Sequence, residues 1–121
     1  TALATMSNCE QAKHVIDTLQ LRNQFDFVAT RDDVTKGKPD PEIYSLVAAQ
    51  LQSDPADRLV IEDSPAGVAA ALRAGMRCVA VATPFTRQAL HSSGLPEEQW
   101  IVDDPAELIH TVESRYSTEP I

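Results

Sequence analysis

The chain has few cysteines, few basic residues and no long apolar run, and each absence excludes a class of protein. Two cysteines, Cys9 and Cys78, are too few for a disulfide framework and lack metal-site spacing, so a reducing cytoplasm is the expected compartment. Ten lysines and arginines against eighteen acids give a net charge of −8, which argues against nucleic acid or an anionic membrane as the main partner. No apolar run approaches a membrane span, and no signal peptide is visible.

The length of 121 residues and the ordinary share of apolar residues, 43 %, indicate one globular domain. The stretch from Leu59 to Gly75 has its most informative pattern. Leu59-Val60-Ile61 is typical of a buried parallel strand, and the acids Glu62 and Asp63 follow it directly. Ser64-Pro65 then suits the N-cap and the first position of a helix. Two carboxylates at a strand end repel each other unless a cation lies between them, and their oxygens suit Mg²⁺. The alternatives are a solvated strand end, or Asp63 as a helix cap.

The rest of the chain alternates short apolar runs with amphipathic segments. Further strands are expected at residues 2–5, 25–30, 78–82 and 100–102, and further helices are expected to be capped by Ser7, Asp40, Thr86 and Asp104. In the last helix Leu108, Ile109 and Val112 should face inward, and residues 114–121 should form a loose tail. This alternation predicts an α/β fold, a parallel sheet in a Rossmann-like three-layer α/β/α arrangement.

Three polar side chains lie in loops where a phosphate could bind. Thr5 and Ser7 follow the first expected strand, and hydroxyls and helix-terminal N–H groups in such a turn can hold a phosphate. Lys38 precedes the helix that begins near Asp40, where a lysine can act as a point charge on a phosphate. Each has a simpler alternative. Ser7 can be a plain N-cap, and Lys38, like its neighbour Lys36, can be a solvated loop lysine.

Four segments of the chain occur together in the order of a known enzyme family. They are Leu3-Ala4-Thr5-Met6-Ser7-Asn8, Gly37-Lys38-Pro39-Asp40-Pro41, Ile61-Glu62-Asp63-Ser64-Pro65-Ala66-Gly67 and Ala74-Gly75-Met76. Together they resemble the haloacid dehalogenase-like hydrolases, especially the branch of small phosphatases and β-phosphoglucomutase. The resemblance extends over nearly the whole chain, and its most specific part is the third segment.

The resemblance implies a role for each candidate residue. Thr5 and Lys38 match the second and third motifs of the family, so both would hold the transferring phosphoryl group. Asp63, assisted by Glu62, matches the fourth motif and would hold Mg²⁺. The residues that would lie near the substrate phosphate are Ser7 and Asn8. These roles agree with what phosphoryl transfer requires, which is positioning and charge neutralisation.

One family motif is missing. No Asp-x-Asp occurs in the chain, whereas the family has a strand ending in this motif, with the nucleophile and the general acid/base, before the segment that matches Thr5. The family's substrate-selecting cap also lies before that segment. We therefore expect residues 1–121 to be a partial core domain, the C-terminal part of a larger hydrolase, and to have no phosphatase activity alone.

The missing strand predicts a slot in the sheet. In the resembled fold it lies between Ala2–Thr5 and Leu59–Ile61. Neighbouring strands lie roughly 4.8 Å apart, so the slot would be about twice that wide and would have unpaired backbone groups on both walls. It would be left open, filled by a strand of another chain, or removed by a rearranged fold. Open edges of this kind also favour oligomers.

The leading hypothesis is a Mg²⁺-dependent phosphatase of a small phosphorylated metabolite, acting through an aspartyl phosphate whose aspartate lies outside this chain. A phosphomutase of the β-phosphoglucomutase type is a close variant. The rival is a non-catalytic domain that uses the same fold for binding, and an Asp-x-Asp strand upstream in the parent sequence would separate the two. A response-regulator-like module also has acids at strand ends, but the Glu62–Gly67 pattern speaks against it.

Overall fold

The computed structural model describes residues 1–118 as short strands and helices that alternate along the chain. The strands are β1 (Ala2–Ala4), β2 (Phe27–Ala29), β3 (Leu59–Glu62), β4 (Arg77–Val81) and β5 (Ile101–Val102). The α-helices are α1 (Cys9–Thr18), α2 (Glu42–Gln50), α3 (Pro65–Arg73), α4 (Arg87–Ser93) and α5 (Leu108–Thr118). Short 3₁₀ helices occupy Arg31–Asp33, Pro55–Asp57, Glu98–Trp100 and Pro105–Glu107. Over the described residues, no helix is long and apolar enough to cross a membrane.

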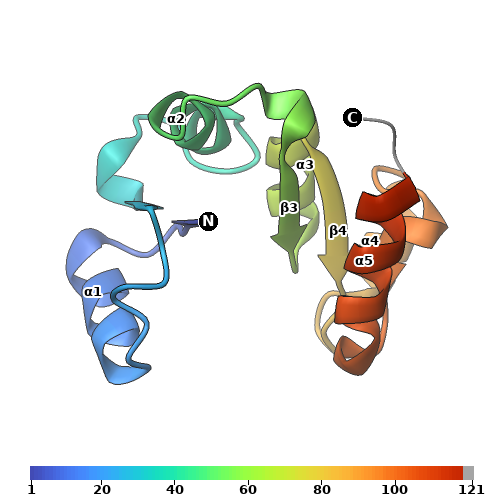
Figure 1. Ribbon diagram of the computed structural model, residues 1–121. Coiled ribbons are helices and arrows are strands. Elements are labelled where there is room, and N and C mark those ends of the chain that lie inside the picture. Colours follow the sequence, from blue (N-terminus) through green and yellow to red (C-terminus); the bar gives the residue numbers. More distant parts are fainter. Residues whose placement is uncertain (119–121) are drawn as a thin grey trace.

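All paired strands run parallel, which confirms the expected α/β class. The strands form two separate sheets, one with the order β1-β2 and one with the order β3-β4-β5. Leu3 lies opposite Val28 in the first sheet, and Ile61 lies opposite Val79 in the second. In Figure 1 the two sheets stand on the two sides of an arch, and α2 lies across its top.

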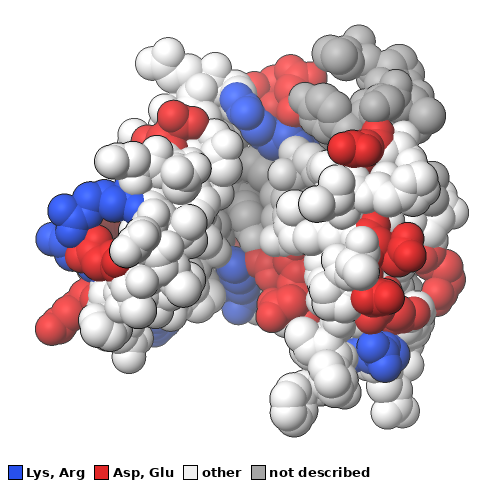
Figure 2. All heavy atoms as spheres, turned by 60° about the horizontal axis from the view of Figure 1, so that its bottom comes forward, with Lys and Arg blue, Asp and Glu red and all other residues white. Residues whose placement is uncertain are grey.

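The two sheets are separated where the sequence predicts a slot. β1 pairs with β2 and β3 pairs with β4, so within residues 1–118 the facing edges of β1 and β3 have no strand partner. Residues of both strands line the space between these edges, which is visible as a hollow in Figure 2. Ile61, in the middle of β3, is 52 % exposed there. The predicted separation of Ala2–Thr5 from Leu59–Ile61 is therefore confirmed.

The helices α2 and α3 join the two sheets into one body. α2 packs against β1, β2 and α3, while α3 packs against β3 and β4. Ile43 of α2 and Val68 of α3 are fully buried and belong to the same apolar cluster as Ala29 of β2 and Ala80 of β4. One core therefore extends under both sheets, and it fixes the position of β1 relative to β3 although the two strands do not pair.

The boundaries of α3 and α4 agree with the sequence. Ser64 caps α3, since its Oγ accepts a hydrogen bond from the Gly67 N–H at 3.1 Å, and Pro65 is the first helical residue. Gly75, just after α3, has a φ of +83°, a left-handed conformation that glycine adopts without steric cost. Thr86 is the N-cap residue of α4, but its hydroxyl makes no capping hydrogen bond and instead contacts Thr83.

The start of α1 differs from the prediction. Asn8, and not Ser7, is the N-cap residue, because Asn8 Oδ1 accepts the hydrogen bond of the Gln11 N–H at 2.8 Å. Ser7 instead belongs to the preceding turn, where its N–H donates to Thr5 Oγ1 at 3.1 Å. A helix begins where a side chain can accept from its first unpaired N–H groups, and here that side chain is one residue further along.

Two later helices also differ from the prediction. In α2 the N-cap residue is Pro41, where Asp40 was expected, although Asp40 Oδ1 still accepts from the Glu42 N–H at 3.0 Å. Ile109, expected to face inward, is 73 % exposed, whereas Leu108 and Val112 of the same helix are partly buried. α5 also continues to Thr118, so the expected tail is helical up to that residue. Its remainder, residues 119–121, lies outside the described residues.

Candidate active site

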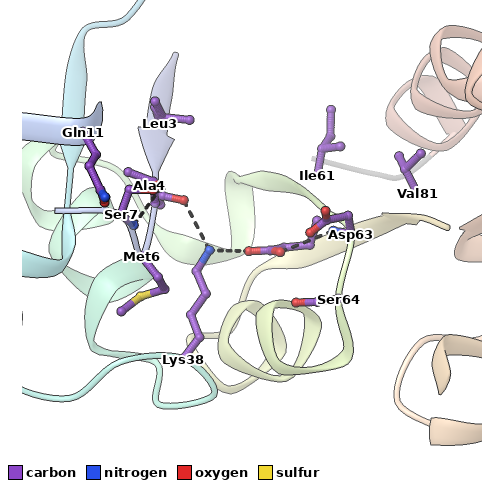
Figure 3. A pocket seen from close by; sticks show the side chains of 12 residues that line it. Leu3, Ala4, Met6, Ser7, Gln11, Lys38, Ile61, Asp63, Ser64 and Val81 are labelled. Carbon is purple, nitrogen blue, oxygen red and sulfur yellow. Dashed lines mark hydrogen bonds and ion pairs between the residues drawn. The ribbon is translucent and has the colours of Figure 1, made fainter. Parts of the chain in front are cut away.

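A groove opens where the carboxyl ends of β1 and β3 face each other. Thr5 and Ser7, after β1, line one side of it, and Glu62 and Asp63, at the end of β3, line the other. Lys38, from the loop before α2, reaches between the two sides, as Figure 3 shows. Ligands of open α/β sheets bind at the carboxyl ends of the strands, so this is the edge at which chemistry is expected.

The Lys38 ammonium group bridges the two walls of the groove. Its Nζ donates a hydrogen bond to the Ala4 carbonyl of β1 at 3.2 Å and forms an ion pair with Glu62 Oε2 of β3 at 2.5 Å. Its side chain is only 12 % exposed. Lys36 is different, because this residue is exposed and, within residues 1–118, its hydrogen bond comes from the backbone N–H, which donates to Glu42 Oε2 at 2.8 Å. The two lysines therefore have different environments, although they lie only two positions apart in the sequence.

The carboxylate of Glu62 is buried and already occupied. Its Oε2 accepts from Lys38 Nζ and from the hydroxyl of Tyr44. Among the described residues, its Oε1 accepts only a long hydrogen bond, 3.3 Å, from the N–H of the next residue, Asp63. Oε2 therefore accepts the hydrogen bonds of Lys38 and Tyr44, and a further ligand of this carboxylate would have to bind Oε1.

Asp63 has a different environment. The residue is exposed at the edge of the groove, and within residues 1–118 its carboxylate takes part in no hydrogen bond or ion pair. An exposed carboxylate without a partner, one residue after Glu62, fits a hard cation such as Mg²⁺, which uses one or two protein carboxylates and keeps several waters. No cluster of three acidic, histidine or cysteine side chains that could hold a metal occurs in the described part of the chain. The remaining ligands would have to come from substrate, water or other residues.

The turn after β1 places two hydroxyl groups at the groove. Thr5 continues the pairing of β1, since its N–H donates to the Ala29 carbonyl at 3.0 Å. Its Oγ1 accepts from the Ser7 N–H, so the proton of the Thr5 hydroxyl is left for another acceptor. Asn8 is placed differently: it caps α1 and is absent from the lining of the groove. The structure therefore brings five of the six predicted residues together and leaves Asn8 outside.

Tyr44 is a residue of this site that the sequence analysis does not single out. It lies on α2, is 6 % exposed, and its hydroxyl donates to Glu62 Oε2. Burial first, and then the hydrogen bond to Glu62, raises the pKa of Tyr44 far above its usual range, so the hydroxyl keeps its proton. A tyrosine beside the apolar residue Ile43 is ordinary in a helix, and the sequence gives no sign of its contact with a residue 18 positions away.

Gly67 provides the space that the Glu62 carboxylate occupies. A Cβ added at Gly67 would overlap the carboxylate of Glu62. Gly67 lies in the first turn of α3 and is buried. An alanine would ordinarily suit a helix better than glycine by about 1 kcal/mol, so here close approach, and not backbone freedom, explains the glycine.

We expect Gly67→Ala to lower the free energy of unfolding by about 1–3 kcal/mol, as for other overpacked sites, because the Glu62 carboxylate must leave its position between Lys38 and Tyr44. Gly37→Ala is the matched control. A Cβ there would lie 2.7 Å from Met6 Cε, the mobile end of a side chain that can move away, so its effect should be smaller. Urea unfolding measures both variants. A Gly67→Ala variant as stable as the parent would show that Glu62 points elsewhere.

Known proteins resemble this chain over about two thirds or more of its length. The family described as "Haloacid dehalogenase-like hydrolase" matches residues 1–81. Validoxylamine A 7′-phosphate phosphatase of Streptomyces hygroscopicus subsp. limoneus is 42 % identical over 81 residues, which are 67 % of this chain and 38 % of that protein. The phosphorylated carbohydrates phosphatase of Thermotoga maritima is 44 % identical over 75 residues, which are 62 % of this chain and 35 % of that protein.

A solved structure extends the likeness beyond residue 81. The crystal structure of a candidate β-phosphoglucomutase from Thermotoga maritima matches with a TM-score of 0.80 and 35 % identity, over 93 % of this chain and 51 % of that one. The chain therefore spans about half or less of each of these three proteins. Since the family match takes in well over half of the chain and the structural match nearly all of it, this chain belongs to the haloacid dehalogenase-like hydrolases.

Proposed function

We propose that the protein to which this chain belongs is a Mg²⁺-dependent phosphatase of a small phosphorylated metabolite, acting through an aspartyl phosphate on an aspartate outside these 121 residues. The observation that carries the proposal is the position of the Lys38 ammonium between the ends of β1 and β3, with the unpaired carboxylate of Asp63 in the same groove. Relatives named as phosphatases support the class of reaction. The acidic balance of the chain favours neither nucleic acid nor a membrane as partner.

Lys38 has one donor left for substrate. An ammonium group has three N–H donors, and the Ala4 carbonyl and Glu62 Oε2 take two of them. The third is available to an oxygen of the transferring phosphoryl group. Because negative charge is distributed over these oxygens during phosphoryl transfer, a fixed positive charge beside them lowers the barrier. The ion pair with Glu62 keeps that charge in place before substrate arrives.

The other residues of the groove complete this environment. The Thr5 hydroxyl has its proton free to donate to a phosphoryl oxygen, and Ser7 follows on the same turn. Asp63, with Glu62 beside it, would hold Mg²⁺, which when bound adds positive charge at the phosphoryl group. These residues bind and orient the phosphoryl group, and the attacking carboxylate comes from outside the chain.

A phosphomutase of the β-phosphoglucomutase type is the second candidate. It is favoured by the similarity to the candidate β-phosphoglucomutase structure from Thermotoga maritima. Such an enzyme returns the phosphoryl group to a sugar hydroxyl, whereas a phosphatase gives it to water. Lys38, Thr5 and Asp63 would have the same roles in both reactions.

The test of the proposed function is the release of inorganic phosphate by the complete protein, which joins this chain to its Asp-x-Asp segment. p-Nitrophenyl phosphate and a panel of small sugar and polyol phosphates are offered with Mg²⁺ and again after chelation with EDTA. We expect turnover that needs Mg²⁺ and stops on chelation. Isomerisation of a sugar phosphate without phosphate release would favour the mutase. The absence of reaction with every ester would contradict both candidates.

A further inference from the structure

We propose that Tyr44 is a positioning residue that fixes Lys38 for phosphoryl transfer by holding the Glu62 carboxylate. This inference rests on the proposed role of Lys38. The Tyr44 hydroxyl and Lys38 Nζ both bind the same oxygen, Glu62 Oε2. The Tyr44 ring also lies under the ammonium group, with Lys38 Nζ 5.2 Å from the ring centroid. Tyr44 therefore restrains Lys38 twice, once through Glu62 and once through its ring face.

The location of Tyr44 excludes a direct contact with substrate in the groove. Its side chain is absent from the groove lining at the carboxyl ends of β1 and β3. It belongs to the apolar core and lines the adjoining part of the slot, between the middles of the two strands. Its neighbour Ile43 and, one turn later, Val47 are buried in the packing of α2. The ring is thus held by the core, while its hydroxyl reaches the base of the site. Tyr44 acts through Glu62 and not on the reacting atoms.

The physical reason for such a residue is the freedom of the two side chains that it contacts. Glutamate and lysine have several rotatable bonds, and holding them in one geometry costs conformational entropy. Within residues 1–118, Glu62 Oε1 accepts only the 3.3 Å hydrogen bond from Asp63, so the stronger contacts that fix the carboxylate are those of Oε2. With the Tyr44 hydroxyl in place, Oε2 has two donors and one orientation. Without the Tyr44 hydroxyl, the Glu62 carboxylate can rotate about its Cγ–Cδ bond, and the Lys38 ammonium group that it binds can move as well.

The experiment compares Tyr44→Phe with Thr30→Val in the complete protein. Tyr44→Phe removes only the hydroxyl and keeps the ring. Thr30→Val removes another buried hydroxyl, one that donates to the carboxylate oxygen Asp33 Oδ2 at 3.2 Å, and Thr30 is not among the residues that line the groove. We expect Tyr44→Phe to lower kcat for p-nitrophenyl phosphate about tenfold, the size of one lost hydrogen bond to a charged group, with KM changed less than kcat. Thr30→Val should leave kcat within about twofold.

Two further measurements separate positioning from a structural role. In a Lys38→Ala background, Tyr44→Phe should have no additional effect on kcat, because the ammonium group that Tyr44 positions is absent. The ¹⁵Nζ NMR signal of Lys38, which needs no turnover, should shift in Tyr44→Phe and stay in place in Thr30→Val. Additive kcat losses, an unchanged kcat in Tyr44→Phe, or an unchanged Lys38 signal would each overturn the inference. If the wild-type protein hydrolyses no phosphate ester, the proposed function is wrong, and so is the kinetic part of this inference. A shift of the Lys38 ¹⁵Nζ signal in Tyr44→Phe would still show that Tyr44 positions Lys38.

Discussion

Replacing Asp63 with asparagine should abolish the Mg²⁺-dependent phosphatase activity of the complete protein and leave its fold intact. Asparagine has nearly the same shape but lacks the negative charge that a hard cation requires. The fold should tolerate the change, because Asp63 is exposed and its carboxylate has no partner within residues 1–118. Turnover of p-nitrophenyl phosphate at saturating Mg²⁺ and urea unfolding give the two readouts.

Asp57→Asn is the matched control for this prediction. Asp57 is also an exposed aspartate, but it lies just before β3, at the opposite end of the strand from Asp63. Its replacement changes the net charge by the same amount and should leave turnover near that of the parent. Wild-type turnover by Asp63→Asn would rule out Asp63 as the metal ligand, and equal losses in both variants would indicate a general effect of charge.

Replacing Lys38 with alanine should lower kcat of the complete protein by about two or more powers of ten, the loss typical when one charge-stabilising group is removed. Its ammonium is the positive charge that bridges β1 and β3 in the groove. Removal also leaves the Glu62 carboxylate buried with Tyr44 as its remaining side-chain partner, and breaking a buried ion pair costs about 3–5 kcal/mol. Activity is therefore compared per folded molecule, with the folded fraction taken from urea unfolding.

Lys36→Ala is the control for Lys38→Ala. Lys36 lies two residues away and is exposed. Within residues 1–118 its hydrogen bond comes from the backbone N–H, which any residue except proline provides. We expect a kcat within about twofold of the parent, as for most surface substitutions. Equal effects of the two substitutions would mean that the loop contributes general positive charge, and that Lys38 has no specific role.

The elements around the site could be predicted because their signals are local. Leu59-Val60-Ile61 forms the strand that its apolar run predicts, and Ser64 caps α3 through a hydrogen bond to a residue three positions later. Hydrogen bonds over such short separations depend on residue types at fixed spacing. Local spacing does not decide which residue caps α1, because Ser7 and Asn8 are both good cap residues. The contacts of the turn after β1 decide between them.

The sequence by itself determined the alternation of strands and helices, the acid pair at the end of β3, and the resemblance that the family match confirms. Only the tertiary structure decided how the charges are paired. Lys38 and Tyr44 reach Glu62 across 24 and 18 residues of sequence, and Gly67 makes room for its carboxylate. These contacts depend on α2 packing against both β1 and α3, which brings the two sheets to a fixed separation. Packing over such distances is set by the shape of the whole core, and no spacing rule along the chain encodes it.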